Sequence, residues 1–218
     1  LILNLSSLRS HFEFRRSKEF RIYILGVHDQ KAELFLLKDK SQKAAPWNNF
    51  HLFTEEIYFD VIRKKTAALF AACTKSAALS VNASDEEAEF SRLFGEYIGI
   101  CFQIKDDIFD YFESKEIGKP TGNDMLEGKL TLPVLYALNS TNSTWAQEIA
   151  VKVKEGIATP DEIGRLVDFT KSNGGIEYAV KMMELYKGKA LDLLHSLPPS
   201  EVCTALEAYL DYVVDRDK

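Results

Sequence analysis

From Phe53 to the end of the chain, apolar residues recur with the spacing of buried helix faces, whereas no regular period persists before Phe53. The strongest pattern spans residues 85–110, where apolar side chains cover most of the helix circumference. A helix of this kind is typical of the centre of a bundle. Gly95 and Gly99 lie one turn apart on it and should let a neighbouring helix come close.

Capping and helix-breaking residues divide the rest of this region into further helices. Thr54 can cap the first helix, which carries two glutamates in its first turn and should extend to Leu79. Gly and Pro clusters mark the other boundaries. The further helices that we expect are Asp124–Leu138, Trp145–Lys154, Asp161–Ser172, Ile176–Leu197 and Ser200–Val214. The pattern therefore predicts an all-α bundle with short connections.

The first 50 residues have a different character. Glu19–Val27 is expected to form a short strand, and residues 38–49 are charged and then rich in turn formers. We therefore predict two regions, an irregular and atypical N-terminal segment over residues 1–52 and a helical body over residues 53–218.

Composition and charge exclude several classes of protein. Hydrophobic residues make up 46% and charged residues 28% of the 218 positions, which is too apolar for a disordered chain. Residues 1–50 contain 9 Lys and Arg against 5 Asp and Glu, whereas residues 51–218 contain 18 against 28. A body this acidic should not bind nucleic acid. No apolar run reaches the ~18–20 residues that span a bilayer, and no secretory signal is visible at the start.

The cysteines indicate a compartment. Cys73, Cys101 and Cys203 are odd in number and widely spaced, which fits neither a disulfide framework nor a zinc site. This usage favours buried thiols in a reducing environment. We therefore expect a cytoplasmic protein.

Three carboxylates interrupt the most apolar helix of the chain. Asp106 and Asp110 are one turn apart, Asp107 and Asp110 are three residues apart, and Gln103 lies one turn before Asp107. Burying these acids unpaired would be costly, so a positive partner is required. Mg²⁺, held by one or two carboxylates and by substrate phosphates, suits this arrangement. The alternative is an exposed acidic stripe that pairs with surface lysines.

Cationic residues in the same part of the sequence could complete an anion site. Lys65 and Thr66 lie within a helix beside a run of alanines, Lys119 lies in a Gly-rich loop, and Lys129 follows Gly128. A lysine ammonium is a mobile point charge that suits phosphate oxygens. Each lysine alone could equally be a solvated surface residue, and the combination carries the argument.

The segments that hold these residues resemble a known family. They are IRKKTAALFAACTKSAAL, FGEYIGICFQIKDDIFDYF and GKPTGNDMLEGKLTLPVLYAL. In order and spacing they resemble the C-terminal half of a trans-isoprenyl diphosphate synthase, of the polyprenyl (octaprenyl-type) synthetase family. The resemblance implies an isoprenoid-synthase helical bundle, here incomplete, around a deep cavity.

The resemblance also implies an activity, in which an allylic diphosphate ionises and is attacked by isopentenyl diphosphate to give a longer polyprenyl diphosphate. Asp106, Asp107 and Asp110 match the family's second aspartate-rich motif, which binds Mg²⁺. Lys65, Lys119 and Lys129 match lysines that hold the allylic diphosphate. Thr66 and Gln103 match polar residues that lie near the allylic cation, so that Lys65, Thr66 and Gln103 form the implied catalytic set.

The sequence departs from the family pattern before residue 53. The family carries a first DDxxD motif on an earlier helix, and residues 1–50 contain only Asp29 and Asp39 as aspartates. We interpret this as a truncated or disrupted gene, with activity impaired by the missing motif. The alternative is a non-catalytic partner subunit of a full-length synthase, in a homodimer or heterodimer formed through helices. A terpene cyclase or head-to-head synthase is disfavoured by GKPTGND and EGKLTLP.

Overall fold

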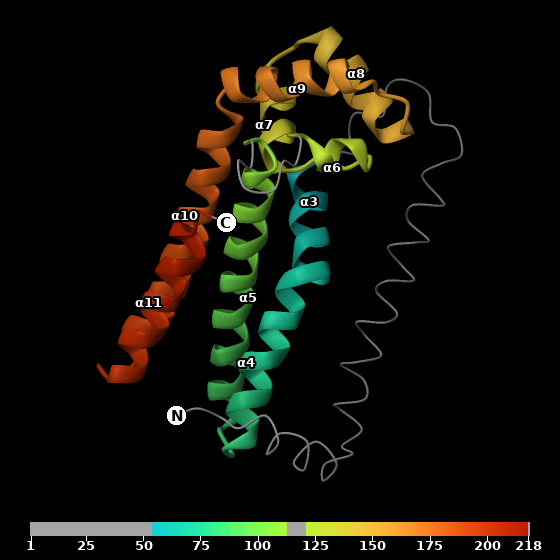
Figure 1. Cartoon of the computed structure of the whole chain (residues 1–218). Helices are drawn as coiled ribbons and strands as arrows, with labels where there is room; N and C mark the ends of the chain where they lie inside the picture. The colour runs from blue at the N-terminus through green and yellow to red at the C-terminus, as the bar shows by residue number, and fades with distance from the viewer. Residues whose placement is uncertain (1–53, 113–120, 218) are drawn as a thin grey trace. The chain divides into compact units, whose positions relative to one another are not determined.

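The computed structural model describes residues 54–112 and 121–217, and within these ranges every regular element is helical (Figure 1). The all-α class that the sequence predicts is therefore confirmed. The strand expected at Glu19–Val27, the boundary near residue 52 and Lys119 lie outside the described residues.

The central element is α5, Asp85–Phe109, which runs between α4 on one side and α10 and α11 on the other (Figure 1). Ser84 caps it through a capping box with Glu87, as an N-terminal Ser followed by three acids would favour. Ile98, Ile100 and Ile104 are almost completely buried along its length. The acids therefore lie on the best-packed helix of the body, which gives them fixed positions.

The first predicted helix is present with a local distortion. It comprises α3 (Glu55–Ile62), a single π-helical stretch η2 (Arg63–Ala67) and α4 (Ala68–Ser80). The close approach expected at the two glycines is confirmed, because a Cβ on Gly95 would lie 2.3 Å from Thr74 Oγ1 and one on Gly99 would lie 2.5 Å from Ala67 Cα. Only glycine allows this distance between α5 and the η2–α4 segment.

The helix predicted over Asp124–Leu138 is wrong as one element. The structure has a short α6 (Asn123–Leu126), a loop, and then α7 (Leu132–Ser140). Gly128 adopts a φ of 75°, a left-handed conformation that ends a helix and that glycine reaches without strain. Pro133 occupies the first turn of α7, where its missing N–H costs nothing.

The remaining helices agree with the expected bounds to within two residues. They are α8 (Thr144–Glu155), α9 (Pro160–Ser172), α10 (Gly175–His195) and α11 (Glu201–Asp215). In Figure 1, α10 descends beside α5 and α11 returns along it, so the end of α11 comes back to the middle of the bundle. None of the described helices is both long and apolar enough to cross a membrane.

The three thiols differ from the buried set that we expected. Cys101 is buried, whereas Cys73 is exposed and Cys203 is partly exposed. Cys73 lies on α4, whose alanine-rich sequence does not separate into an apolar and a polar face and so gives no signal of which face is covered. All three are free cysteines, as their spacing indicated.

Candidate metal and diphosphate site

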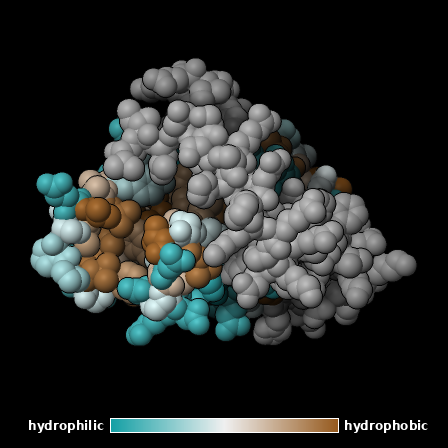
Figure 2. Space-filling view, turned by 90° about the horizontal axis from the view of Figure 1, so that it is seen from below, coloured by the Kyte–Doolittle hydropathy of each residue, from teal (hydrophilic) through white to brown (hydrophobic). Residues whose placement is uncertain are grey.

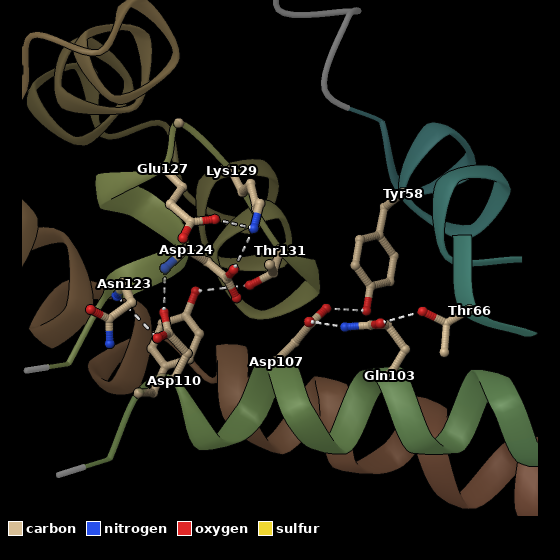
Figure 3. A network of polar contacts seen from close by, with 12 residues as sticks. Tyr58, Thr66, Gln103, Asp107, Asp110, Asn123, Asp124, Glu127, Lys129 and Thr131 are labelled. Carbon is tan, nitrogen blue, oxygen red and sulfur yellow. Dashed lines mark hydrogen bonds and ion pairs between the residues drawn. The ribbon is translucent and has the colours of Figure 1, made fainter. Parts of the chain in front are cut away.

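The centre of the candidate site is the carboxylate of Asp107, which is only 4% exposed. The Tyr58 hydroxyl donates to Asp107 Oδ2 at 2.6 Å and Gln103 Nε2 donates to Oδ1 at 2.8 Å (Figure 3). Burial raises the pKa of Asp107 to about 7, although these two hydrogen bonds and the charge of Lys65 act in the opposite direction. The charge of Lys65 and the two hydrogen bonds therefore do not offset the burial of this carboxylate.

Thr66 extends this network onto η2. Its hydroxyl donates to Gln103 Oε1 at 2.6 Å, so Thr66, Gln103, Asp107 and Tyr58 form one chain of hydrogen bonds between α3–η2 and α5 (Figure 3). Thr66 reaches Gln103 because its neighbour Ala67 packs directly on Gly99. Wide π turns inside helices often occur at functional sites, and here the turn carries Lys65 and Thr66.

Asp110 has a different environment from Asp107. Its carboxylate accepts hydrogen bonds from the backbone N–H groups of Asn123 at 3.0 Å and Asp124 at 3.1 Å, at the start of α6. Its carbonyl oxygen accepts from the Gly122 N–H at 2.8 Å. Burial and the charge of Asp124 raise the pKa of Asp110, while the backbone donors lower it. Asp110 therefore links the start of α6 to the end of α5 through hydrogen bonds.

Lys129 joins the site through α6. Its ammonium forms an ion pair with Asp124 at 3.3 Å and another with Glu127 (Figure 3). The hydrogen bond to Glu127 is the main cause that raises the pKa of Lys129. In the absence of a diphosphate, the charge of Lys129 is thus balanced by two acids of its own segment.

Asp106 lies on another side of α5. Its carboxylate accepts a hydrogen bond from the guanidinium of Arg216, just after α11, and its side chain is 40% exposed. Helix geometry explains the separation, because successive side chains on an α-helix point about 100° apart. Asp106 and Asp107 are therefore adjacent in sequence and held by partners from opposite sides.

The predicted site residues are thus brought together in part. Asp107, Gln103 and Thr66 share one network with Lys65 acting on it, whereas Asp110 and Lys129 meet through Asp124. Across the two described ranges, no three His, Cys, Asp or Glu side chains are close enough together to hold a metal ion by themselves. Mg²⁺ commonly binds through one or two carboxylates and substrate phosphates, so its binding here depends on the diphosphate.

Comparison with known protein families identifies the family of the chain. The profile of the Polyprenyl synthetase family matches residues 34–169, which is more than half of the chain. This chain belongs to the polyprenyl synthetase family. The match also extends into the segment over residues 1–52 that we expected to be atypical.

Several similar proteins are named as polyprenyl diphosphate synthases. Component 2 of the heptaprenyl diphosphate synthase of Geobacillus stearothermophilus is 35% identical over 188 residues, which cover 86% of this chain and 55% of the relative. The octaprenyl diphosphate synthase of Escherichia coli is 31% identical over 166 residues, covering 76% of this chain and 51% of the relative. The chain thus spans about half the length of these curated relatives.

A solved structure shares the fold. The geranylgeranyl pyrophosphate synthase of Bacteroides thetaiotaomicron superposes with a TM-score of 0.83 at 58% identity, over 98% of this chain and 67% of that one. The isoprenoid-synthase bundle expected from the sequence is therefore confirmed.

Sequence reasoning missed three residues of the site. Tyr58 precedes Lys65 by seven residues, about two helical turns, and this spacing could have placed it on the same face. Asp124 follows the turn-forming Gly122, which indicates a helix start. Arg216 is a single basic residue between two acids, and no local pattern in the sequence connects it with Asp106.

Removing the Tyr58 hydroxyl should weaken the candidate site without unfolding the protein. Tyr58→Phe leaves the buried Asp107 carboxylate one donor short, which should cost about 1–3 kcal/mol of unfolding free energy at pH 8. Chemical unfolding measures this change in the free energy of unfolding. Tyr209→Phe is the matched control, because Tyr209 is exposed. Equal, small effects of both substitutions would show that the Tyr58–Asp107 bond does not matter.

Proposed function

We propose that this chain carries the metal- and diphosphate-binding half of a prenyltransferase, which condenses an allylic diphosphate with isopentenyl diphosphate to a longer polyprenyl diphosphate. The observation that carries the proposal is the buried Asp107 carboxylate between Tyr58 and Gln103, with Lys65 acting on it and Asp106 next to it. A structural helix has no need for such an arrangement, because a buried and poorly compensated carboxylate destabilises the fold.

The donor set suits Mg²⁺. Asp106 and Asp107 supply hard carboxylate oxygens, and the half-exposed Asp106 can reach a ligand that approaches from solvent. When bound, Mg²⁺ would neutralise the charge that develops on the departing diphosphate. In this proposal Asp110 serves the metal site by holding α6 and, through it, Asp124 and Lys129, because both of its oxygens already accept backbone hydrogen bonds.

The other residues act on the organic substrate. Lys65, Lys119 and Lys129 would bind the diphosphate oxygens as point charges, with Lys129 leaving Glu127 and Asp124 for the ligand. Thr66 and Gln103 hold each other in place, so their oxygen dipoles have a fixed orientation toward a nearby allylic cation. Phe70 and Phe102 pack against each other, with ring centroids 5.5 Å apart, and would help to exclude water.

The isolated chain should bind a metal–diphosphate complex and yet not extend a prenyl chain. We expect titration calorimetry with Mn²⁺ and inorganic pyrophosphate to show weak binding that Asp106→Ala and Asp107→Ala abolish and that Asp168→Ala, on the exposed face of α9, leaves unchanged. We expect no product from labelled isopentenyl diphosphate and an allylic primer, because the first aspartate-rich motif is absent from the sequence. Losing one preorganised electrostatic group costs ~10²–10³ in rate, and several are missing here.

The binding measurement tests the proposed site, and the product measurement tests the predicted loss of activity. Binding that survives both aspartate substitutions would contradict the proposed site. Robust metal-dependent product from the purified chain would contradict the predicted impairment while supporting the activity.

The three free cysteines favour a reducing compartment, so we propose that the protein acts in the cytoplasm.

A second candidate function is that of a partner subunit in a homodimer or heterodimer. Two relatives, from Geobacillus stearothermophilus and Bacillus subtilis, are named component 2 of a heptaprenyl diphosphate synthase. Large apolar side chains are exposed on α4 and α11, including Leu69, Val81, Val202 and Tyr212, and Figure 2 shows apolar groups gathered on the face seen from below. Surfaces of this kind often contact another protein. If this function is correct, adding the chain to a full-length synthase should change the length of its product.

A further inference from the structure

The end of the last helix contributes an arginine to the acidic part of α5. Arg216 is only 12% exposed, although it lies two residues from the end of the chain. Its guanidinium donates to the Asp106 carboxylate and to the Phe102 carbonyl oxygen, the latter at 3.2 Å. It also lies over the rings of Phe102 and Phe109, at 4.2 Å and 5.3 Å from their centroids.

These contacts are more specific than those of an ordinary surface ion pair. An exposed pair contributes little, because both side chains are mobile and solvated. Here Nε of Arg216 also donates to the Val213 carbonyl oxygen, so two nitrogens of the planar guanidinium are held by hydrogen bonds. Arginine suits this position better than lysine, because its flat guanidinium can stack on a ring and donate in several directions.

The contacts of Arg216 bear on the two neighbouring carboxylates, Asp106 and Asp107, which repel each other when both are ionised. Tyr58 and Gln103 hold Asp107 on one side of α5, and Arg216 holds Asp106 on another. Without Arg216, the Asp106 carboxylate would be free to rotate, and repulsion from Asp107 would act on an unrestrained side chain. The hydrogen bond from Arg216 uses Oδ1 of Asp106, so Oδ2 is the oxygen that would serve as a metal ligand in the proposed function.

We propose that Arg216 is a positioning residue that orients the Asp106 carboxylate for a metal–diphosphate complex, so that the segment directly after α11 takes part in the site. This inference rests on the proposed function. The alternative explanation is that Arg216 serves only to attach the end of α11 to the rest of the bundle. The alternative requires the packing of the side chain on Phe102 and Phe109, whereas the proposal requires its positive charge.

Two variants separate charge from packing in the full chain. Arg216→Lys keeps a positive charge, and Arg216→Met keeps an apolar stem of similar length on the two rings. We expect Arg216→Met to weaken the binding of Mn²⁺–pyrophosphate by about tenfold, the lower end of the loss in metal affinity when a residue that orients a metal ligand is removed, while Arg216→Lys retains most of it. Both variants should unfold at similar temperatures. Arg165→Met on α9, where the guanidinium lies over Trp145, is the matched control and should bind as wild type does.

Each outcome decides between the two explanations. Equal affinity of the Met and Lys variants would overturn the assignment of Arg216. If both bind normally, Arg216 has no role in binding. If both bind weakly, the positive charge is not what the site requires. A wild-type chain that binds no Mn²⁺–pyrophosphate would contradict the proposed function, and the role of Arg216 would fall with it. Binding by wild type and Lys but a tenfold loss for Met supports the proposal.

Discussion

Gly99→Ala should destabilise the protein by about 3 kcal/mol, because the added methyl group has no space. A Cβ at this position would lie 2.5 Å from Ala67 Cα and 3.0 Å from Ala67 Cβ. The first of these is a backbone atom, so relief requires moving η2 away from α5. That movement would also separate Thr66 from Gln103, and the variant should therefore lose diphosphate binding as well as stability. Urea unfolding measures the stability change.

Two other helical glycines provide matched controls for this prediction. A Cβ on Gly164 in α9 or on Gly188 in α10 would meet nothing within 4 Å. Alanine at these positions should stabilise the protein by roughly 0.5–1 kcal/mol, because glycine is the poorer helix former. A Gly99→Ala variant as stable as Gly188→Ala would show that α5 and η2 do not pack this closely.

Stability should fall as the pH rises from about 4 to about 7, because Asp107 loses its proton in the unfolded state and keeps it in the folded state. Burial raises the pKa of this carboxyl from 3.8 to about 7. Between these values the folded state binds one more proton at this residue than the unfolded state does. Stability that Asp107 contributes is therefore complete below pH 4 and is lost as the pH approaches 7, at up to about 1.4 kcal/mol per pH unit.

The Asp107→Asn variant isolates this effect from all other titrating groups. Asparagine remains neutral, so the variant should be more stable than wild type at pH 8, while the difference should disappear near pH 4. Parallel urea unfolding at several pH values tests it, with Asp192→Asn on α10 as the exposed control. A wild type that keeps a constant difference from Asp107→Asn across this range would mean that Asp107 is not buried as described.

The sequence predicted most accurately the features that depend on a single helix, such as where that helix begins and ends. Capping residues and breaks placed α8 to α11 within two residues, because each helix carries its own start and stop signals. The two glycines of α5 predicted a close neighbour, since nothing else in a buried helix favours them. The π turn was not predicted, and it lies where Ala67 packs on Gly99, a contact between two helices that local sequence does not report.

The candidate site was predictable in its residue types and not in its arrangement. Spacing placed Asp106 and Asp110 on one face, and yet each has a different partner, because Asp110 caps the end of α5 where the chain turns toward α6. Tyr58 lies 49 residues before Asp107, and Arg216 lies 110 residues after Asp106. Contacts over such separations depend on how whole helices pack, and helical periodicity does not report them.

The most direct test of the proposed site is a crystal structure of this chain grown with Mn²⁺ and inorganic pyrophosphate. The anomalous signal of Mn²⁺ locates the metal without reference to any assumed ligand. We predict a peak within ~2.5 Å of carboxylate oxygens of Asp106 or Asp107, with pyrophosphate reaching toward Lys65. A metal and pyrophosphate bound only at other acids, such as those of α11, or no anomalous peak at saturating Mn²⁺, would contradict the site proposed here.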